Sequence, residues 1–362
     1  MRAFSLIIVS AAASFVLAVP VEAQSPMFSV KALPTLEGAT RETAYAIDNR
    51  GVAIGIIQGG TKCPTECVVA WVNGEVTPQD APQGATKYVG TIGLSRNGTA
   101  VATAVINGVN QAVAWFSDVP TLLPAPDSQH TATVANGVND SSQVVGSASD
   151  SAGDTIAVIW DVTTPLTLET PSGATSAYAE GINDSGLVVG YVCCTSTQKK
   201  NEATVWHGTT PALLAKSAPA GGAMGEATAV NESGVAVGIA NDSGVVDHAV
   251  AWSNKSIISL VSGRSYASAI NSHGIIVGQM LSGEQPLAVV WGNDASAPQD
   301  LNSLISATAA SEIELTSAAG INDNCVIVAN GHVKSSGAIK AFVLTINDSD
   351  NCVNGLAPKT GF

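Results

Sequence analysis

Hydrophobic and polar positions recur along this chain in a ten-residue block that occurs seven times. Each copy has an apolar residue, then a polar turn, then a run of small and β-branched residues that ends in glycine or alanine. Two of the copies read AIDNRGVAIG (46–55) and GINDSGLVVG (181–190), and the other five begin at residues 93, 137, 229, 269 and 320. Self-similarity at such a period is typical of propellers and solenoids.

A second apolar block repeats in phase with the first and ends in tryptophan. It reads VVAW at Trp71 and AVAW at Trp115, and the seventh copy has Leu344 at the tryptophan position. All six tryptophans of the chain therefore occupy one repeat position: 71, 115, 160, 206, 252 and 291. We interpret them as core side chains between neighbouring sheets, in preference to a stacking platform for sugars, because aromatic residues dominate core burial.

Each unit is consistent with four short strands, with glycine in the tight turn between the first two, at the position expected to need φ > 0. Four strands in about 45 residues match a propeller blade. Residues 28–36 resemble a fourth strand placed before the first full unit, so we expect this segment to complete the last blade. The pattern predicts an all-β fold, a seven-bladed β-propeller of four-stranded antiparallel blades over residues 24–347, closed by the N-terminal strand. Six or eight blades, or a right-handed β-solenoid, are the alternatives.

Residues 1–23 have the pattern of a signal peptide: Arg2, an apolar stretch over 3–19, and small residues before the expected cleavage after Ala23. The apolar stretch is short for a membrane span, which needs about 20 residues. We therefore expect an exported protein, secreted, periplasmic or attached to the cell surface, with residues 348–362 as a C-terminal tail. The net charge of −14 and the absence of any basic run argue against nucleic acid as a partner.

The two blocks resemble the bacterial extracellular repeat family named for its HAF tripeptide, whose unit pairs an A-x-x-I-N-[DN]-x-G-x-V-V-G element with H-A-F-x-W. The resemblance extends over nearly the whole chain after residue 23. It is uneven, because only His248 keeps the family histidine before alanine and only Phe342 keeps the family phenylalanine. It implies a secreted or surface-associated propeller-like protein and no particular reaction.

Six cysteines in an exported chain predict three disulfides, with 15 possible connectivities. Cys325 replaces a turn glycine of the seventh unit and Cys352 follows the third strand of that unit, on the same face, so a Cys325–Cys352 bridge is expected. The remaining four cysteines lie in loops of units one and four, about half a ring apart. Local pairs are therefore favoured over cross-pairing: Cys63–Cys67 and Cys193–Cys194. No metal site is predicted, because zinc sites usually show paired cysteine or histidine spacings.

Polar and aromatic residues gather where the fourth strand of one unit leads into the first strand of the next. These connections should meet at the mouth of the central channel, where ligands of concave sites bind. The candidate ligand-binding residues are Arg41, Glu42, Lys87, Tyr88, His130, Tyr178, Glu226, Arg264, Tyr266 and Glu314. The alternative is that loops simply carry polar residues. The Asn-Asp-Ser-Gly turns, as at 139–142 and 183–186, are interpreted as turn-forming and not as calcium loops.

No catalytic signature of a hydrolase, metalloprotease or nucleotide-binding enzyme is present, and no cofactor or catalytic residue is predicted. The favoured function is a monomeric, non-catalytic binding or adhesion module for extracellular polysaccharide or protein. The alternative is a polysaccharide lyase or hydrolase at the channel mouth, with acids and bases among Glu42, Glu226, Glu314, His130 and Tyr266, because glycosidic cleavage needs a carboxylate pair. A scaffold without a small ligand is a third interpretation.

Overall fold

The structure is a computed structural model of the 362-residue chain. It describes residues 25–353 and Leu356, apart from gaps at 196–197, 216–223, 242–245, 254–255, 262 and 293–296. The predicted signal peptide over 1–23 lies outside the described residues, and so does most of the predicted tail beyond 353. No helix in the described part of the chain is long and apolar enough to cross a membrane.

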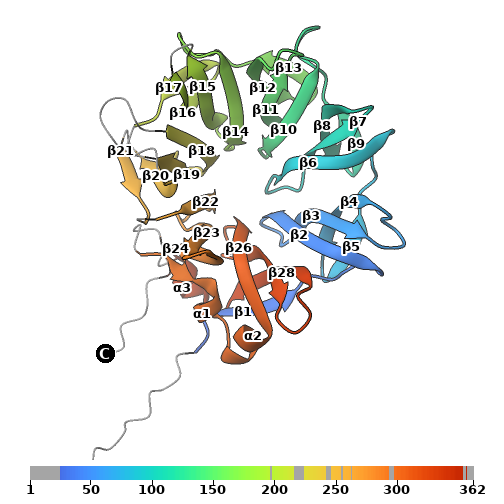
Figure 1. Cartoon of the computed structure of the whole chain (residues 1–362), viewed down its shortest axis with the longest axis vertical. Coiled ribbons are helices and arrows are strands. Elements are labelled where there is room, and N and C mark those ends of the chain that lie inside the picture. The colour runs from blue at the N-terminus through green and yellow to red at the C-terminus, as the bar shows by residue number, and fades with distance from the viewer. Residues whose placement is uncertain are drawn as a thin grey trace, which may run out of the picture.

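Seven four-stranded antiparallel sheets are arranged as the blades of a ring (Figure 1). The first strand of each blade lines the axis and the fourth lies at the rim. Blades 1 to 3 consist of β2 (Ala39–Ile47), β3 (Ala53–Gly59), β4 (Glu66–Val72) and β5 (Glu75–Pro78); β6 (Ala85–Leu94), β7 (Ala100–Ile106), β8 (Val109–Phe116) and β9 (Val119–Leu122); β10 (Ala132–Val138), β11 (Gln143–Ser149), β12 (Thr155–Asp161) and β13 (Thr164–Thr167).

Blades 4 to 6 continue the same order of strands. They consist of β14 (Ser176–Ile182), β15 (Leu187–Thr195), β16 (Gln198–His207) and β17 (Thr210–Leu213); β18 (Met224–Val230), β19 (Ala236–Asn241), β20 (His248–Ser253) and β21 (Ser256–Ser259); β22 (Ser265–Ile270), β23 (Ile276–Ser282), β24 (Gln285–Trp291) and β25 (Gln299–Asp300). Three short helices accompany the last two blades: α1 (Leu301–Leu304), α2 (Ala307–Glu312) and α3 (Ser349–Val353).

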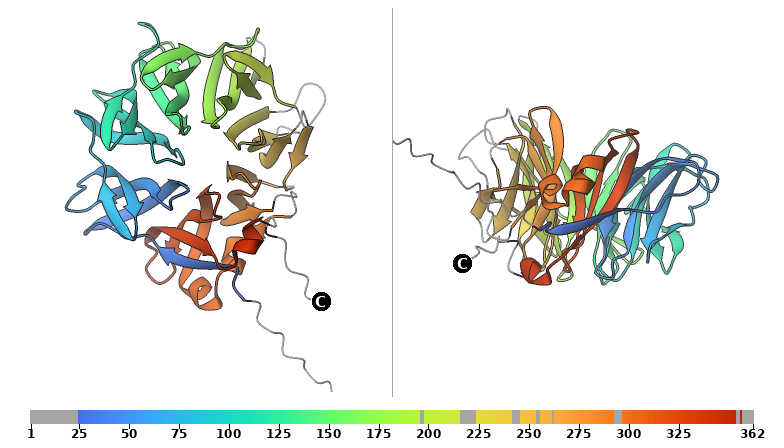
Figure 2. Two further views of the ribbon diagram at one scale, coloured as in Figure 1. Left: turned by 180° about the vertical axis from the view of Figure 1, so that it is seen from behind. Right: turned by 90° about the horizontal axis from the view of Figure 1, so that it is seen from below.

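Blade 7 joins the two ends of the chain. It contains β26 (Ile313–Ile321), β27 (Ile327–Val333) and β28 (Ile339–Ile346), and its outer strand is β1 (Phe28–Ala32). Strand β1 pairs antiparallel with β28, with Phe28 opposite Ile346. Both described ends of the chain therefore lie at this blade (Figure 2). The predicted seven-bladed propeller, closed by its N-terminal strand, is confirmed, and the solenoid alternative is excluded.

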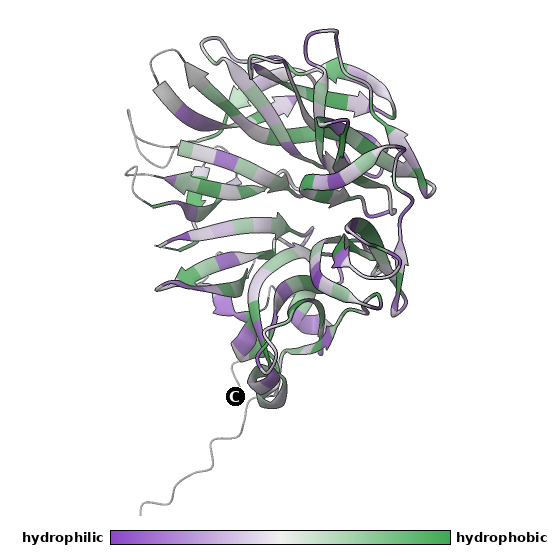
Figure 3. Cartoon of the chain, turned by 45° about the vertical axis from the view of Figure 1, so that its right-hand side comes forward, coloured by the Kyte–Doolittle hydropathy of each residue, from purple (hydrophilic) through white to green (hydrophobic). Residues whose placement is uncertain are grey.

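The core is divided among the junctions between blades. Seven apolar clusters of described residues each combine side chains of two neighbouring blades, and apolar and polar residues alternate along the strands (Figure 3). All six tryptophans are at most 3% exposed. The indole N–H of Trp71 donates to Pro34 O, and that of Trp115 to Asp80 O, in the connections that enter their blades. The interpretation of the tryptophans as core residues is confirmed.

The glycine that ends the V-V-G run is required by a bulge in the first strand. In blades 1 and 3 to 6 a Cβ at this position would lie 1.9–2.1 Å from a carbonyl oxygen of the first strand. In blade 5, for example, the clash would join Gly238 to Glu226 O, next to the register shift between Ala227 and Ala229. The repeated glycine thus fixes the path of the strand that lines the axis.

Chain direction divides the surface into two faces. The turn face carries the turns between first and second strands, and the loop face carries the connections between blades. Disulfide Cys325–Cys352 lies on the turn face, where it ties α3 to blade 7, and Cys63–Cys67 lies on the loop face of blade 1. Both predicted pairs are confirmed. The predicted Cys193–Cys194 pair involves Cys194, whose side chain lies outside the described residues.

Candidate functional site

The turn face holds a belt of asparagine side chains around the axis, formed by Asn139, Asn183, Asn231, Asn271 and Asn322. Each amide donates to the backbone carbonyl of the equivalent residue in the next blade at 2.8–3.1 Å, and the last donates to Asp48. Each amide oxygen also accepts a backbone N–H of its own turn, as Asn231 does from Val235. The asparagines, at most 3% exposed, therefore join blades as well as form turns.

The belt is interrupted at blades 1 and 2, where aspartate and serine replace asparagine. Asp48 has no amide to donate, and its carboxylate instead accepts from the guanidinium of Arg50 at 2.8 Å. Arg50 packs against Gly98 in the turn of blade 2, where a Cβ would lie 1.8 Å from the guanidinium. At the next junction Asn97 takes over the role of Ser95 and donates to Asp140 O at 2.7 Å.

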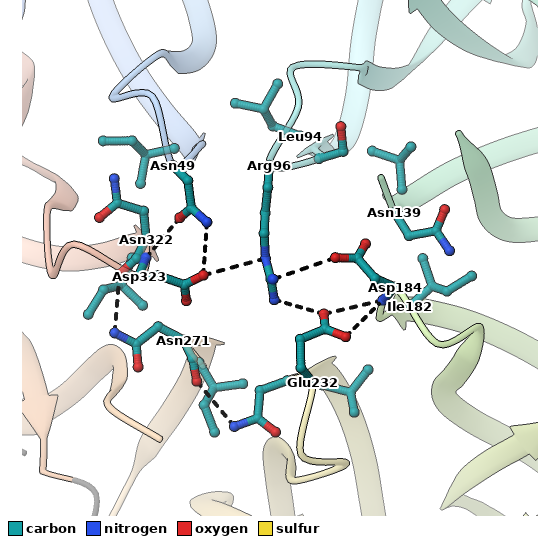
Figure 4. A pocket seen from close by; sticks show the side chains of 17 residues that line it. Asn49, Leu94, Arg96, Asn139, Ile182, Asp184, Glu232, Asn271, Asn322 and Asp323 are labelled. Atoms are coloured by element: carbon teal, nitrogen blue, oxygen red, sulfur yellow. Dashed lines mark hydrogen bonds and ion pairs between the residues drawn. The ribbon is translucent and has the colours of Figure 1, made fainter. Parts of the chain in front are cut away.

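One arginine crosses the channel at the turn face (Figure 4). Arg96 of blade 2 makes ion pairs with three carboxylates of other blades: Glu232 at 2.7 Å, Asp184 at 3.5 Å and Asp323 at 3.7 Å. All four residues directly follow the asparagine-belt position or its equivalent in their turns. Among the described residues no group of histidine, cysteine or carboxylate side chains is arranged to hold a metal ion, and Arg96 is the cation among these carboxylates.

The three carboxylates also accept hydrogen bonds from the neighbouring turns. Asp184 accepts the backbone N–H of Asp140 at 2.8 Å, and Asp323 accepts that of Ser272 at 2.8 Å. Burial works to raise the pKa of Asp323, but the hydrogen bonds from Ser272 and Asn49 and the charge of Arg96 outweigh it, so the pKa is lowered. We call this network of Arg96, Asp184, Glu232 and Asp323 the clasp, because its ion pairs join blades 2, 4, 5 and 7 across the channel.

A cavity of about 560 Å³, which we call the axial chamber, lies along the axis on the loop-face side of the clasp. It is lined by the first strands of the blades. A ring of seven branched aliphatic side chains lines the cavity around Arg96: Ile47, Leu94, Val138, Ile182, Val230, Ile270 and Ile321. All of them except Ile270 also line the axial chamber. These residues end the seven first strands, so the chamber extends from the aliphatic ring toward the loop face.

The two carboxyl groups of the chamber wall, together with Tyr266, lie in one sector formed by blades 4 to 6. Glu180 of β14, Glu226 of β18 and Tyr266 of β22 line the chamber. Behind the carboxyls, Tyr178 stacks on Tyr191 of the neighbouring strand, with ring centroids 4.7 Å apart. Tyr178, Glu226 and Tyr266 occupy one repeat position in blades 4 to 6. In blades 1, 3 and 7 the same position is occupied by Thr43, Val134 and Ser317.

Few hydrogen-bond donors reach the two carboxyl groups of this sector. Glu226 accepts a hydrogen bond from the amide of Asn201, whereas Glu180 accepts none among the described residues. Burial, and then the charge of Glu226, raise the pKa of Glu180 to about 7. Burial and the same two carboxylates also raise the pKa of Tyr191. Carboxyls and phenols with raised pKa values in a cavity are a common property of ligand-binding and catalytic sites.

Three of the ten predicted ligand-binding residues belong to this sector: Tyr178, Glu226 and Tyr266. Four others make contacts away from it. Glu42, 1% exposed, pairs with Lys340 of blade 7, and Glu314 pairs with His332 of the adjacent strand. Tyr88 is buried against Trp115, and His130 bonds through its ring to Asp127 at 2.9 Å.

The last three predicted residues, Arg41, Lys87 and Arg264, are exposed near the starts of first strands. Most of the ten lie within first strands and not in the connecting loops where we placed them. The sequence argument missed Glu180, Tyr191 and Arg96. Arg96 and the acidic residues it pairs with share one repeat position, so comparing the repeats column by column could have revealed the clasp.

The fold and the ring-centred cavity define a β-propeller. No protein-family model matches the chain, and no curated protein sequence matches it. Among solved structures, it is similar to a puromycin hydrolase (TM-score 0.56, 9% identity, 83% of this chain and 53% of that one) and to a puromycin-hydrolyzing peptidase from Mycobacterium tuberculosis (0.53, 11%, 85% and 54%). It is also similar to YCF48 bound to a D1 peptide (0.50, 10%, 92% and 100%).

These similarities show the fold alone, because every identity is far below 25%. The chain spans about half the length of the two puromycin-hydrolysing proteins and the full length of YCF48. Propellers of this kind therefore occur both in partner-binding proteins and as parts of enzymes.

Proposed function

We propose that the protein is a binding module that takes its ligand in the axial chamber, against the sector formed by Glu180, Glu226 and Tyr266. The observation that supports this most directly is the contrast between sectors. The repeats share most of their structural residues, while the only carboxyl groups among the described residues that line the chamber, those of Glu180 and Glu226, lie in adjacent blades next to Tyr266. A cavity with a few convergent polar groups is the usual form of a small-ligand site.

We further propose that the module works outside the cytoplasm, on polysaccharide or protein of the cell exterior. The disulfides Cys63–Cys67 and Cys325–Cys352 support this location, because disulfides persist in oxidising compartments. The leader pattern over residues 1–23 and the resemblance to HAF-repeat proteins support the same location. Monomeric behaviour also stays a prediction.

A thermal-shift screen of the chain from residue 24 onward, with soluble glycan fragments and peptides, tests the proposal. A ligand at about 100 times its Kd adds about 2.7 kcal/mol of stability. We expect a shift for one ligand class that is lost in Tyr266→Ala and Glu226→Gln and kept in Glu75→Gln, an exposed residue of the outer strand β5. A shift unaffected by the chamber variants would place the ligand elsewhere and refute the proposed site.

A second candidate function, glycosidic bond cleavage, is favoured by one observation. Glu180, with its pKa raised to about 7, lies near the carboxyl of Glu226. A protonated carboxyl beside an ionised one is the arrangement of glycosidase acids and nucleophiles or bases. Turnover of a bound glycan that disappears in Glu180→Gln, while binding persists, would replace the binding module with an enzyme. Binding without turnover in the unaltered protein supports the first proposal.

A further inference from the structure

The charges on the chamber wall are of one sign. Glu180 and Glu226 are acidic, and the described residues that line the chamber include no lysine, arginine or histidine. Arg96, the nearest cation on the axis, lies beyond the aliphatic ring and is held by its own three carboxylates. The pair of carboxyls therefore has no counter-charge within the chamber.

Tyrosine is concentrated around the same cavity. The chain has five tyrosines, of which Tyr45 and Tyr266 line the chamber and the stacked pair Tyr178–Tyr191 lies beside the two carboxyls. Tyr88 is buried in the junction between blades 1 and 2, against Trp115, and Tyr45 also packs against that junction. Aromatic faces attract cations by about 0.5–2 kcal/mol each, depending on how far water is excluded. Tyrosine rings beside carboxyl groups that have no counter-ion therefore favour a positively charged ligand.

The other classes of ligand fit this wall less well. An anion would meet two carboxyls and no basic side chain. A neutral sugar could exchange hydrogen bonds with Glu180 and Glu226, but it supplies no charge to offset the two carboxylates when both are ionised, a state that is costly in a cavity without a counter-ion. An ammonium group satisfies the carboxyls as a donor and neutralises them at the same time. The net charge of −14 on the whole chain also increases the rate at which cations arrive.

We propose that the axial chamber binds an organic cation, whose ammonium group lies against Glu180 and Glu226 while its carbon skeleton contacts Tyr266. This inference rests on the proposed binding function and names its ligand chemistry. The cation could be a free polyamine or an amino-sugar unit of a polysaccharide, because both present ammonium groups on a short carbon skeleton.

Proton linkage gives the inference a distinctive readout. The titratable groups that interact with Glu180 among the described residues are Glu226 of β18 and Tyr191 of β15, and Tyr178 stacks on Tyr191. In the empty chamber burial and Glu226 raise the pKa of Glu180 to about 7. A bound cation favours the ionised carboxyl, so binding below this pH releases a proton and affinity rises as the pH rises through it.

Isothermal titration calorimetry with three probes tests the inference: spermidine, the tetramer of glucosamine and the tetramer of N-acetylglucosamine. The two tetramers differ in N-acetylation, which removes the positive charge of each amino group and adds an acetyl group. We expect a cationic probe to bind and the acetylated tetramer to bind at least about tenfold more weakly. Glu180→Gln and Glu226→Gln should each weaken cation binding by about tenfold or more, with Glu75→Gln unchanged. The tighter of spermidine and glucosamine tetramer identifies the source of the cation.

Affinity for spermidine, whose amines stay protonated, should fall about tenfold from about pH 8 to about pH 5.5 in the unaltered protein and not in Glu180→Gln. Equal binding of both tetramers, lost in Tyr266→Ala, would overturn the cation inference and keep the binding module. Failure of both cationic probes to bind at about 1 mM would also overturn the inference. The glycan and peptide screen would then decide the proposed function separately. Unchanged melting temperatures of the variants exclude misfolding as the cause of lost binding.

Discussion

Replacing one asparagine of the belt by aspartate tests whether the belt stabilises the ring. Asn231→Asp keeps the acceptor that caps its own turn and removes the amide that donates to Asn271 O at 3.1 Å. The carbonyl of Asn271 then keeps only the turn hydrogen bond from Gly274 N–H, and the new carboxylate oxygen that faces it is buried without a donor, which costs about 1–3 kcal/mol. At about 2–4 °C per kcal/mol for domains of roughly this size, the melting temperature should fall by about 2–12 °C.

The dependence on pH separates the lost donor from a packing defect. A protonated carboxyl can donate again, and burial raises the pKa of the new aspartate above its unfolded value. The destabilisation of Asn231→Asp should therefore grow as pH rises from about 4 to 8 and shrink below the unfolded pKa of about 3.9. Thermal unfolding followed by circular dichroism measures this directly. Asn73→Asp, the same substitution at an exposed turn residue, is the matched control.

Blade 1 also supplies a design for rescue. There Asp48 is paired with Arg50, and Arg50 packs on the turn glycine of the next blade, Gly98. Adding Ser233→Arg to Asn231→Asp places an arginine at the same spacing, opposite Gly274 of blade 6. We expect it to restore at least half of the lost stability. The reasoning is refuted if Asn231→Asp melts within about 1 °C of the unaltered protein at neutral pH, a shift well below that of 1 kcal/mol.

Three further predictions concern the clasp, the disulfides and the strand glycines. Arg96→Ala should lower the melting temperature at low salt and by much less in about 1 M salt, because the ion pairs are partly exposed and screened; equal effects at both salt concentrations would contradict an electrostatic role. Replacing both cysteines of Cys325–Cys352 by serine should lower the free energy of unfolding by about 3.5 kcal/mol, because the bridged residues are 27 positions apart. The same change at Cys63–Cys67, with a separation of 4, should lower it by about 2 kcal/mol. Denaturant unfolding under matched conditions compares the two variants, and a larger loss at Cys63–Cys67 would refute the loop-length argument. Gly238→Ala should destabilise by about 1–3 kcal/mol, because its Cβ overlaps Glu226 O, and should weaken chamber binding in the same calorimetric assay; Ala102→Gly, at the equivalent position of blade 2, should leave binding unchanged.

The repeat explains why so much of the fold could be predicted from the sequence. Each residue of a repeat has an equivalent in six other blades, so aligning the blocks placed Trp115 in the core and Cys325 and Cys352 on one face. The strand at residues 28–36 was predictable because the seventh unit is one strand short. The observed β1 (Phe28–Ala32) is shorter than the segment, but it fills that gap.

The candidate site was predicted less well because strand phase was not considered. Side chains alternate between the two sides of a strand. Glu42 lies two residues before buried Ala44, on the same side, and is therefore buried in the junction between blades 7 and 1. Glu226 lies one residue before buried Ala227, on the opposite side, and lines the chamber. The bulge that follows Ala179 gives Glu180 its position, and bulges are not readily predicted from a single sequence.

The asparagine belt has a beginning and an end, and this bears on how the chain could be rewired. Its amides run in one sense from blade 3 to blade 1, and the junction between blades 1 and 2 carries no belt bond. The natural termini, by contrast, meet in one sheet, with Phe28 opposite Ile346. A circular permutant that links these ends through a hairpin turn and opens near residues 79–84 would make blade 7 continuous and keep every belt bond. The natural termini, which meet in blade 7, therefore lie one blade away from the junction that carries no belt bond.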